Sequence, residues 1–251
     1  MLVQTLIVLL ASTAALAAPL SGTPAKVDKR DATSDLITQL KAADNAVQRN
    51  QILAAGGNSS FVFDFTNPPS AAVVSSPAGQ LVQATGSTAP FLTDINAAMA
   101  VVVIEPCGVV LPHLHPRADE FVIVIEGEIY TQFIAETGAV LIENELKTLG
   151  ATLLPKGSIH LEYNPTCQPA TFVAAFNNND PGVSFVGANL FSFDDQLVIA
   201  DVGGDAVISG ADLESIRQAL PQGLATGVAE CVNKCGIKLC SKRSLREVYG
   251  L

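Results

Sequence analysis

The sequence PHLHPRADE, residues 112–120, is the most informative stretch of this 251-residue chain. The chain has three histidines, and two of them, His113 and His115, stand two residues apart here. Because side chains alternate between the two faces of a β-strand, both imidazoles are expected on one face. Neutral imidazole is the commonest protein ligand of divalent metals. The pair therefore predicts a metal site on a strand.

Two further residues complete the predicted ligand set. Glu120 opens the run FVIVI, residues 121–125, which is typical of a strand that follows a turn at residues 116–119. Its carboxylate can add an oxygen ligand. The third histidine, His160, follows the turn sequence PKGSI and can supply a third nitrogen. An isolated His-x-His pair is more often a surface or satisfied core feature, but here every histidine of the chain joins the set.

These residues resemble the two motifs of the cupin superfamily, of the germin and spherulin type. The first motif is matched by Gly108, His113, His115, Glu120 and Gly127. The second is matched by Gly150, Pro155, Gly157, His160 and Asn164, with Gly150 to Pro155 one residue shorter than the usual spacing. The resemblance implies an all-β fold, a double-stranded β-helix (jelly-roll) barrel. It also implies that His113, His115, Glu120 and His160 bind Mn²⁺, with Fe²⁺ and Zn²⁺ as alternatives.

The rest of the chain fits one such domain. Short apolar runs favour a sandwich or barrel, and they occupy residues 61–65, 81–84, 97–104, 128–134, 139–146, 151–154, 159–163, 171–176 and 183–186. We predict a barrel over residues 61–193, preceded by an N-terminal helical arm over 31–60 with one amphipathic helix at 34–54. A C-terminal helical extension is predicted over 194–251, with helices at 194–200, 212–220 and 226–233. In germin-like relatives this extension packs on a neighbouring subunit; the alternative is that it closes one end of its own barrel.

The N-terminus has the features of a secretory signal. Residues 6–10, LIVLL, are apolar, and Ala15-Leu16-Ala17 is an A-x-A cleavage sequence, so residues 1–17 are predicted to be a signal peptide. A membrane anchor is the alternative, for which the apolar run is short. Residues 18–30 end in the dibasic pair Lys29-Arg30 and are either a pro-segment or a charged linker. We expect a secreted protein, extracellular or in the cell wall, without a membrane anchor.

Charge and cysteine content narrow the partners. The chain has a net charge of −10, and residues 1–30 carry +2, so removing them leaves −12. Such acidity disfavours nucleic acid as a partner. Five cysteines in a secreted chain predict disulfides and one odd thiol. Cys107 and Cys167 flank the metal strands and are expected to pair near the barrel mouth. Cys231, Cys235 and Cys240 could form a metal cluster, but one disulfide and a spare thiol are favoured. The spare thiol and the C-terminal helices predict a homo-oligomer.

The ligand set restricts the chemistry. Structural zinc stops at four ligands, whereas manganese or iron(II) prefers six, which leaves two positions for a small molecule. The resemblance implies an oxidoreductase that acts on a small acid such as oxalate, or on superoxide. Strand alternation points Glu162 into the barrel, where germins usually carry glutamine, so it is the candidate catalytic proton relay. Alternatively, Glu162 only hydrogen-bonds a ligand imidazole or the backbone. A non-enzymatic, metal-binding structural or storage protein, spherulin-like and dormancy-associated, is the second function considered.

Overall fold

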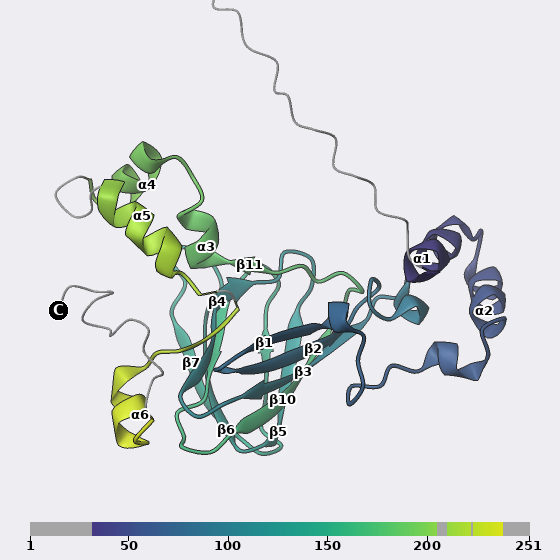
Figure 1. The fold of residues 1–251 in the computed structure, drawn as a ribbon, viewed down its shortest axis with the longest axis horizontal. Helices are drawn as coiled ribbons and strands as arrows, with labels where there is room; N and C mark the ends of the chain where they lie inside the picture. Colours follow the sequence, from purple (N-terminus) through teal and green to yellow (C-terminus); the bar gives the residue numbers. More distant parts are fainter. Residues whose placement is uncertain (1–31, 205–209, 222, 238–251) are drawn as a thin grey trace, which may run out of the picture.

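Two antiparallel β-sheets face each other and enclose the core (Figure 1). The computed structural model describes residues 32–204, 210–221 and 223–237. The first sheet has the strand order β1 (Val73–Ser76), β2 (Gly79–Ala84), β3 (Ala98–Ile104), β10 (Ala170–Phe176), β5 (Glu120–Glu126) and β8 (Ala151–Leu154). The second has the order β11 (Ser184–Phe185), β4 (Gly108–Leu114), β9 (Ile159–Tyr163), β6 (Glu128–Ile134) and β7 (Ile142–Lys147), and β12 (Leu224–Thr226) also pairs with β4. The jelly-roll type of all-β fold predicted from the sequence is confirmed.

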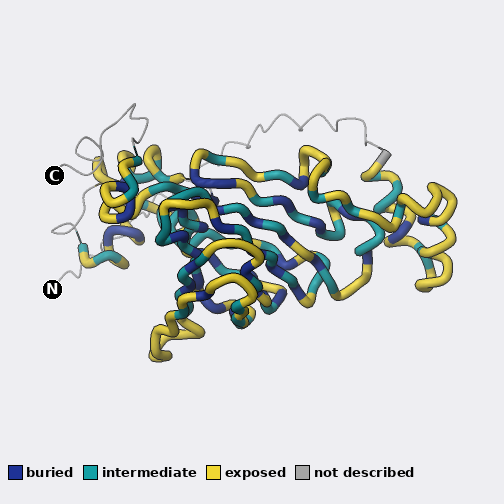
Figure 2. The backbone as a smooth tube through the Cα atoms, turned by 90° about the horizontal axis from the view of Figure 1, so that it is seen from below, coloured by how far each residue is buried: buried dark blue, intermediate teal, exposed yellow. Residues whose placement is uncertain are grey.

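Alternating burial along the strands defines the core (Figure 2). In β10 every second residue from Ala170 to Phe176 is buried, as expected for a strand with one face on the core. Cross-strand register aligns these residues into rows on the inner face of the first sheet. One row joins Phe172 to Val102 on β3 and Val124 on β5, and the next joins Ala174 to Ala100 and Val122.

The N-terminal arm is two helices rather than the single helix predicted over residues 34–54. Helix α1 spans Ala32–Ala42 and α2 spans Ala46–Ala54. The break has a local cause, because the Asn45 side chain accepts a hydrogen bond from the Gln48 backbone N–H at 3.0 Å and so caps a new helix. Figure 1 shows both helices at one end of the molecule, away from the C-terminal helices.

Other elements differ from the prediction near the two ends of the barrel. Residues 61–65 form no strand; a 3₁₀ helix spans Asn58–Phe61, and the Asp64 carboxylate accepts hydrogen bonds from the Thr66 backbone and hydroxyl, which turns the chain. The predicted helix over 226–233 begins later, because β12 holds Leu224–Thr226 in the sheet and α6 spans Ala229–Lys234. Helices α3 (Val186–Leu190), α4 (Asp195–Asp201) and α5 (Gly210–Ala219) precede it, and two further 3₁₀ helices span Ser70–Ala72 and Pro90–Leu92.

Two disulfides fasten the C-terminal segment to this chain's own sheet. Cys107 pairs with Cys231 and Cys167 pairs with Cys235, so the predicted Cys107–Cys167 pair and the predicted disulfide within the C-terminal cluster are both wrong. Both bonds join α6 and the residue after it to loops at the ends of β3 and β9. Since the described C-terminal sulfurs are used in this way, they do not form the metal cluster considered above.

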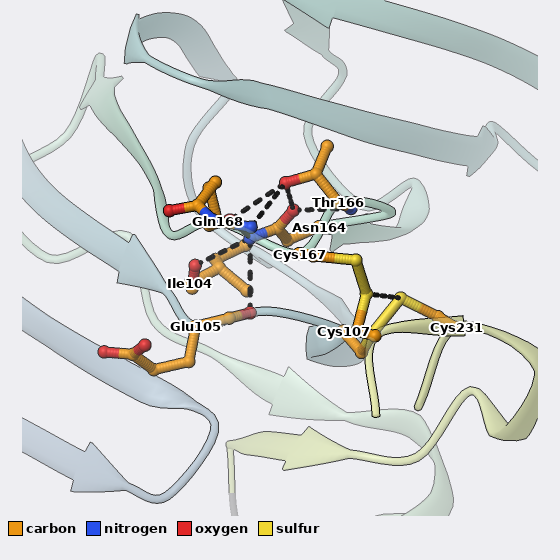
Figure 3. Close-up of a disulfide and its surroundings, with 9 residues drawn as sticks. Ile104, Glu105, Cys107, Asn164, Thr166, Cys167, Gln168 and Cys231 are labelled. Carbon is orange, nitrogen blue, oxygen red and sulfur yellow. Dashed lines mark hydrogen bonds between the residues drawn. A yellow bond between two sulfur atoms is a disulfide. The ribbon is translucent and has the colours of Figure 1, made fainter. Parts of the chain in front are cut away.

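Asn164 organises the loop that carries Cys167 (Figure 3). Its buried amide donates to the backbone carbonyls of Ile104, Glu105 and Gln168, at 3.0, 3.3 and 2.7 Å. Its oxygen accepts from the backbone N–H and the hydroxyl of Thr166. The residue that resembles the end of the second motif is therefore a structural centre outside the metal ligand group.

The predicted signal peptide, the dibasic pair and Cys240 lie outside the described residues. Within residues 32–204, 210–221 and 223–237, none of the helices has the length and apolar character needed to cross a membrane.

Candidate metal centre

The four predicted ligands meet between the two sheets. His113 lies on β4 and faces His160 on β9 directly across the strand pair. His115 follows the end of β4, and Glu120 begins β5 in the opposite sheet. All four side chains are buried, and their candidate ligand atoms lie within 4.8 Å of one another. The sequence prediction that these residues form one group therefore agrees with their placement.

Backbone carbonyls orient all three imidazoles. His113 Nδ1 is 2.8 Å from the Leu111 carbonyl oxygen and His160 Nδ1 is 2.9 Å from that of Ser158, while His115 Nδ1 contacts the carbonyl of Gly182. A carbonyl oxygen only accepts hydrogen bonds, so each Nδ1 carries the proton. Each neutral ring then has a free lone pair on Nε2, which is the atom that faces the group.

This arrangement leaves electron pairs facing one another. Glu120 Oε2 is 3.1 Å from both His115 Nε2 and His160 Nε2. Glu120 Oε2 and His160 Nε2 are buried and have no hydrogen-bond partner within the described structure. Such a set is unfavourable unless a proton or a cation lies between the atoms. Three nitrogen donors and one carboxylate match the donor set of a transition-metal ion, so the residues fit a metal.

The electrostatics of the group favour ligands ready for a metal. Burial lowers the pKa of His113 to about 3, with a further contribution from His160, so its imidazole is neutral at neutral pH. Burial opposes ionisation of Glu120, but its interactions with the nearby imidazoles of His115 and His160 outweigh this and lower its pKa. A metal can therefore bind His113 without displacing a proton from it.

Glu162 borders a cavity beside the ligand group, but its carboxyl lacks the nearby imidazoles that surround Glu120. It is buried on β9, and its Oε1 has no hydrogen-bond partner among the described residues. Burial, followed by the negative charge of Glu120, raises its pKa well above the usual value. The contacts do not include a hydrogen bond from Glu162 to a ligand imidazole. Its side chain borders a cavity of about 330 Å³ that also reaches His113, His115 and Glu120.

Several contacts that position the ligands were not predicted from the sequence. The Asp119 carboxylate accepts hydrogen bonds from the Lys156 backbone at 2.9 Å and from the Asn177 amide at 2.7 Å, which ties the two motif turns together. Gly157 N–H donates to the His115 carbonyl at 3.0 Å across the same gap. The spacing between Gly150 and Pro155 is one residue shorter than usual, and β8 fills all of it, since the strand ends at Leu154, directly before Pro155.

Aromatic rings restrict the imidazoles from the side. The Phe176 ring centre is 4.8 Å from that of His115, and the Phe185 ring centre is 5.6 Å from that of His113. These two phenylalanines lie in apolar runs, so the sequence did not distinguish them from ordinary core residues.

Comparisons with known proteins identify the family of this chain. The Cupin family model matches residues 64–200. Spherulin-1A of Physarum polycephalum is 35% identical over 205 residues, which cover 82% of this chain and 80% of the relative. Germin-like protein subfamily 2 member 2 of Arabidopsis thaliana is 34% identical over 54% of this chain and 62% of its own length.

Solved structures show the same fold. An oxalate oxidase in complex with the substrate analogue glycolate aligns with a TM-score of 0.57 and 23% identity, over 66% of this chain and 82% of that one. An oxalate decarboxylase of Bacillus subtilis aligns with a TM-score of 0.55 and 16% identity, and this chain spans 39% of its length.

Proposed function

This chain belongs to the cupin family, and from that premise we propose that it is a secreted, manganese-dependent oxidoreductase that acts on a small carboxylic acid or on superoxide. The observation that carries the proposal is the convergence of three imidazole lone pairs and the Glu120 carboxylate, with no proton donor between them among the described residues. The similarity to a structure of oxalate oxidase supports the class of substrate. Two disulfides fit an oxidising, extracellular compartment.

The side chains around the group have defined tasks in this proposal. Manganese bound there would supply Lewis-acid and one-electron redox chemistry. The carbonyls of Leu111, Ser158 and Gly182 fix the tautomers of the three histidines. Phe176 and Phe185 limit rotation of two of these rings and exclude water beside them.

Glu162 is the proposed proton donor. Its raised pKa favours the protonated carboxyl, and its position on the cavity wall puts that proton beside the space where a substrate would lie. The alternative from the sequence, a hydrogen bond to a ligand imidazole, is not among the contacts of Glu162. A donor role therefore has more support than a purely structural one.

Metal analysis tests the premise of the proposal. Purified mature protein expressed with manganese should contain about one transition-metal ion per chain, mostly manganese. His160→Ala should be folded and largely metal-free, because it removes a buried nitrogen ligand. Leu161→Ala, one residue further along β9 and outside the ligand group, is the matched control and should retain the metal. A wild-type chain that takes up no metal would refute the proposal.

Activity assays test the reaction. Metal-loaded protein is assayed for hydrogen peroxide production from oxalate and for superoxide removal above that of free Mn²⁺. Glu162→Gln should leave the metal content unchanged and lower turnover by a factor of about 100 or more, as expected for loss of a general acid. If the loaded wild-type protein has neither activity, the oxidoreductase proposal fails and the binding or storage function replaces it.

A further inference from the structure

The cavity beside the four ligands has a lining that restricts what it can bind. Its volume is about 330 Å³, at the lower end of ligand-binding cavities. Its described lining contains two histidines and two glutamates, and otherwise mostly apolar side chains. Lys and Arg are both missing from the described residues that line it. A ligand inside the cavity therefore finds no cationic side chain to pair with.

Charge counting at the ligand group selects a monoanion. A divalent ion with three neutral imidazoles and the Glu120 carboxylate leaves a net charge of +1. One carboxylate head neutralises this charge, whereas a dianion leaves an uncompensated negative charge in a buried, apolar space. Burying an unpaired charge is strongly unfavourable. Glu162, which also borders the cavity, is a carboxyl and adds no positive charge to it.

Small residues at the centre of the first sheet create the room for a larger ligand body. Ala100 on β3 and Ala174 on β10 stand directly opposite each other in the register, and both line the cavity. Their short side chains leave space that longer aliphatic residues would fill. Val102 and Phe172 in the next row, together with Leu224 from β12, supply apolar walls.

We propose that this cavity binds a monocarboxylate with an apolar body, whose single head group lies beside His113 and His115 and whose body packs on the wall formed by Ala100 and Ala174. The inference rests on the proposed function, since it assigns the substrate class of the same site. It makes small dianions less favoured ligands, so oxalate would still be turned over but would bind more weakly than a longer monocarboxylic acid.

Calorimetric titration of manganese-loaded mature protein with acetate, hexanoate and oxalate tests this proposal. Hexanoate carries four methylenes more than acetate, and each buried methylene contributes about a fourfold gain in affinity, so hexanoate should bind on the order of one hundredfold more tightly. Oxalate should bind more weakly than hexanoate. A gain of less than threefold from acetate to hexanoate, or tighter binding of oxalate than of hexanoate, would overturn the inference.

Variants of neighbouring residues on β10 locate the binding. Ala174→Leu should fill the cavity and reduce hexanoate affinity to about that of acetate, with metal content unchanged. Ala175→Leu is the matched control, because the next residue of the strand is on the outer face and should leave hexanoate binding as in the wild type. If Ala174→Leu loses its metal, Ala100→Leu fills the same space from β3. Equal hexanoate affinity in wild type and in a metal-loaded, cavity-filled variant would also overturn the inference.

A gain-of-function variant gives an independent result. Gln83 lines the cavity and stands opposite Ala100 in the register. Gln83→Arg would supply the missing cation and should increase oxalate affinity at least tenfold, while an unchanged affinity would count against the charge argument. Metal analysis before each titration distinguishes failure of the proposed function from failure of the proposed ligand class. Protein without metal refutes the proposed function, whereas metal-loaded protein whose affinity does not depend on chain length refutes only the ligand class.

Discussion

Acid should destabilise the metal-free protein through His113. Burial lowers the pKa of this imidazole to about 3, compared with an ordinary value of 6.5 in the unfolded chain. Between pH 7 and pH 5 the unfolded chain therefore binds a proton at this residue, and the native protein does not. Stability from this group is fully present above the unfolded pKa and is lost as the pH falls from about 6.5 toward 3. Over the interval from pH 7 to pH 5 the linkage amounts to about 2 kcal/mol.

Urea denaturation of chelator-treated protein measures this loss. With a denaturant slope of about 2 kcal/mol per molar, the contribution of His113 corresponds to a shift of about 1 M in the urea midpoint. Glu162 acts in the opposite sense, because its raised pKa keeps a proton on the native protein that the unfolded chain releases. The wild type alone therefore gives the sum of opposing effects, and the comparison with His113→Gln isolates the imidazole.

The two variants should differ in sign. Relative to wild type, His113→Gln should lose less stability, or gain more, on going from pH 7 to pH 5, whereas Glu162→Gln should lose more. If His113→Gln and wild type show the same change in unfolding free energy over this interval, the imidazole is not held neutral by burial. His113 would then not be a neutral ligand ready to bind a metal.

Three other predictions concern the rest of the chain. Serine at both Cys107 and Cys231, with Cys167–Cys235 intact, opens a covalent loop of about 64 residues and should lower the unfolding free energy by about 4 kcal/mol; an unchanged urea midpoint would contradict this. Native secreted material should begin at Asp31, and N-terminal sequencing that finds Ala18 instead would exclude dibasic cleavage. The protein should be a homo-oligomer by light scattering, and a wild-type monomer at micromolar concentration would refute assembly. Leu197→Glu on α4 should weaken this assembly, whereas Val47→Glu on α2, a residue that is equally exposed at 66%, should leave it unchanged.

The ligand group could be predicted from the sequence because short motifs mark its residues. His113 and His115 share a strand face, and scarcity of histidine makes the remaining His160 conspicuous. The strands 98–104 and 170–176 could also be predicted, because their alternating pattern or apolar content is typical of a strand with one buried face.

The disulfide pairing could not be predicted because it depends on where the chain returns in space. Cys107 and Cys231 are 124 residues apart, and only the pairing of β12 with β4 brings α6 beside the β3–β4 turn. The helix break has a local signal, Asn45 with Gln48 three residues later, but the apolar spacing that continues across it favours one longer helix. Residues 61–65 alternate as a strand does, yet they form no strand pairing, and alternation alone does not supply one.

The two disulfides also close a covalent ring within the chain. The segment from Cys107 to Cys167 contains all four ligand residues, and the short segment from Cys231 to Cys235 joins its ends through the two sulfur bridges. Together they form a macrocycle that persists when the fold is lost under oxidising conditions. Within it, His113 and His160 keep a high effective concentration toward each other even in the denatured chain. A protease that cleaves either terminal arm would therefore leave all four ligand residues on one closed ring, which could bind the metal again on refolding.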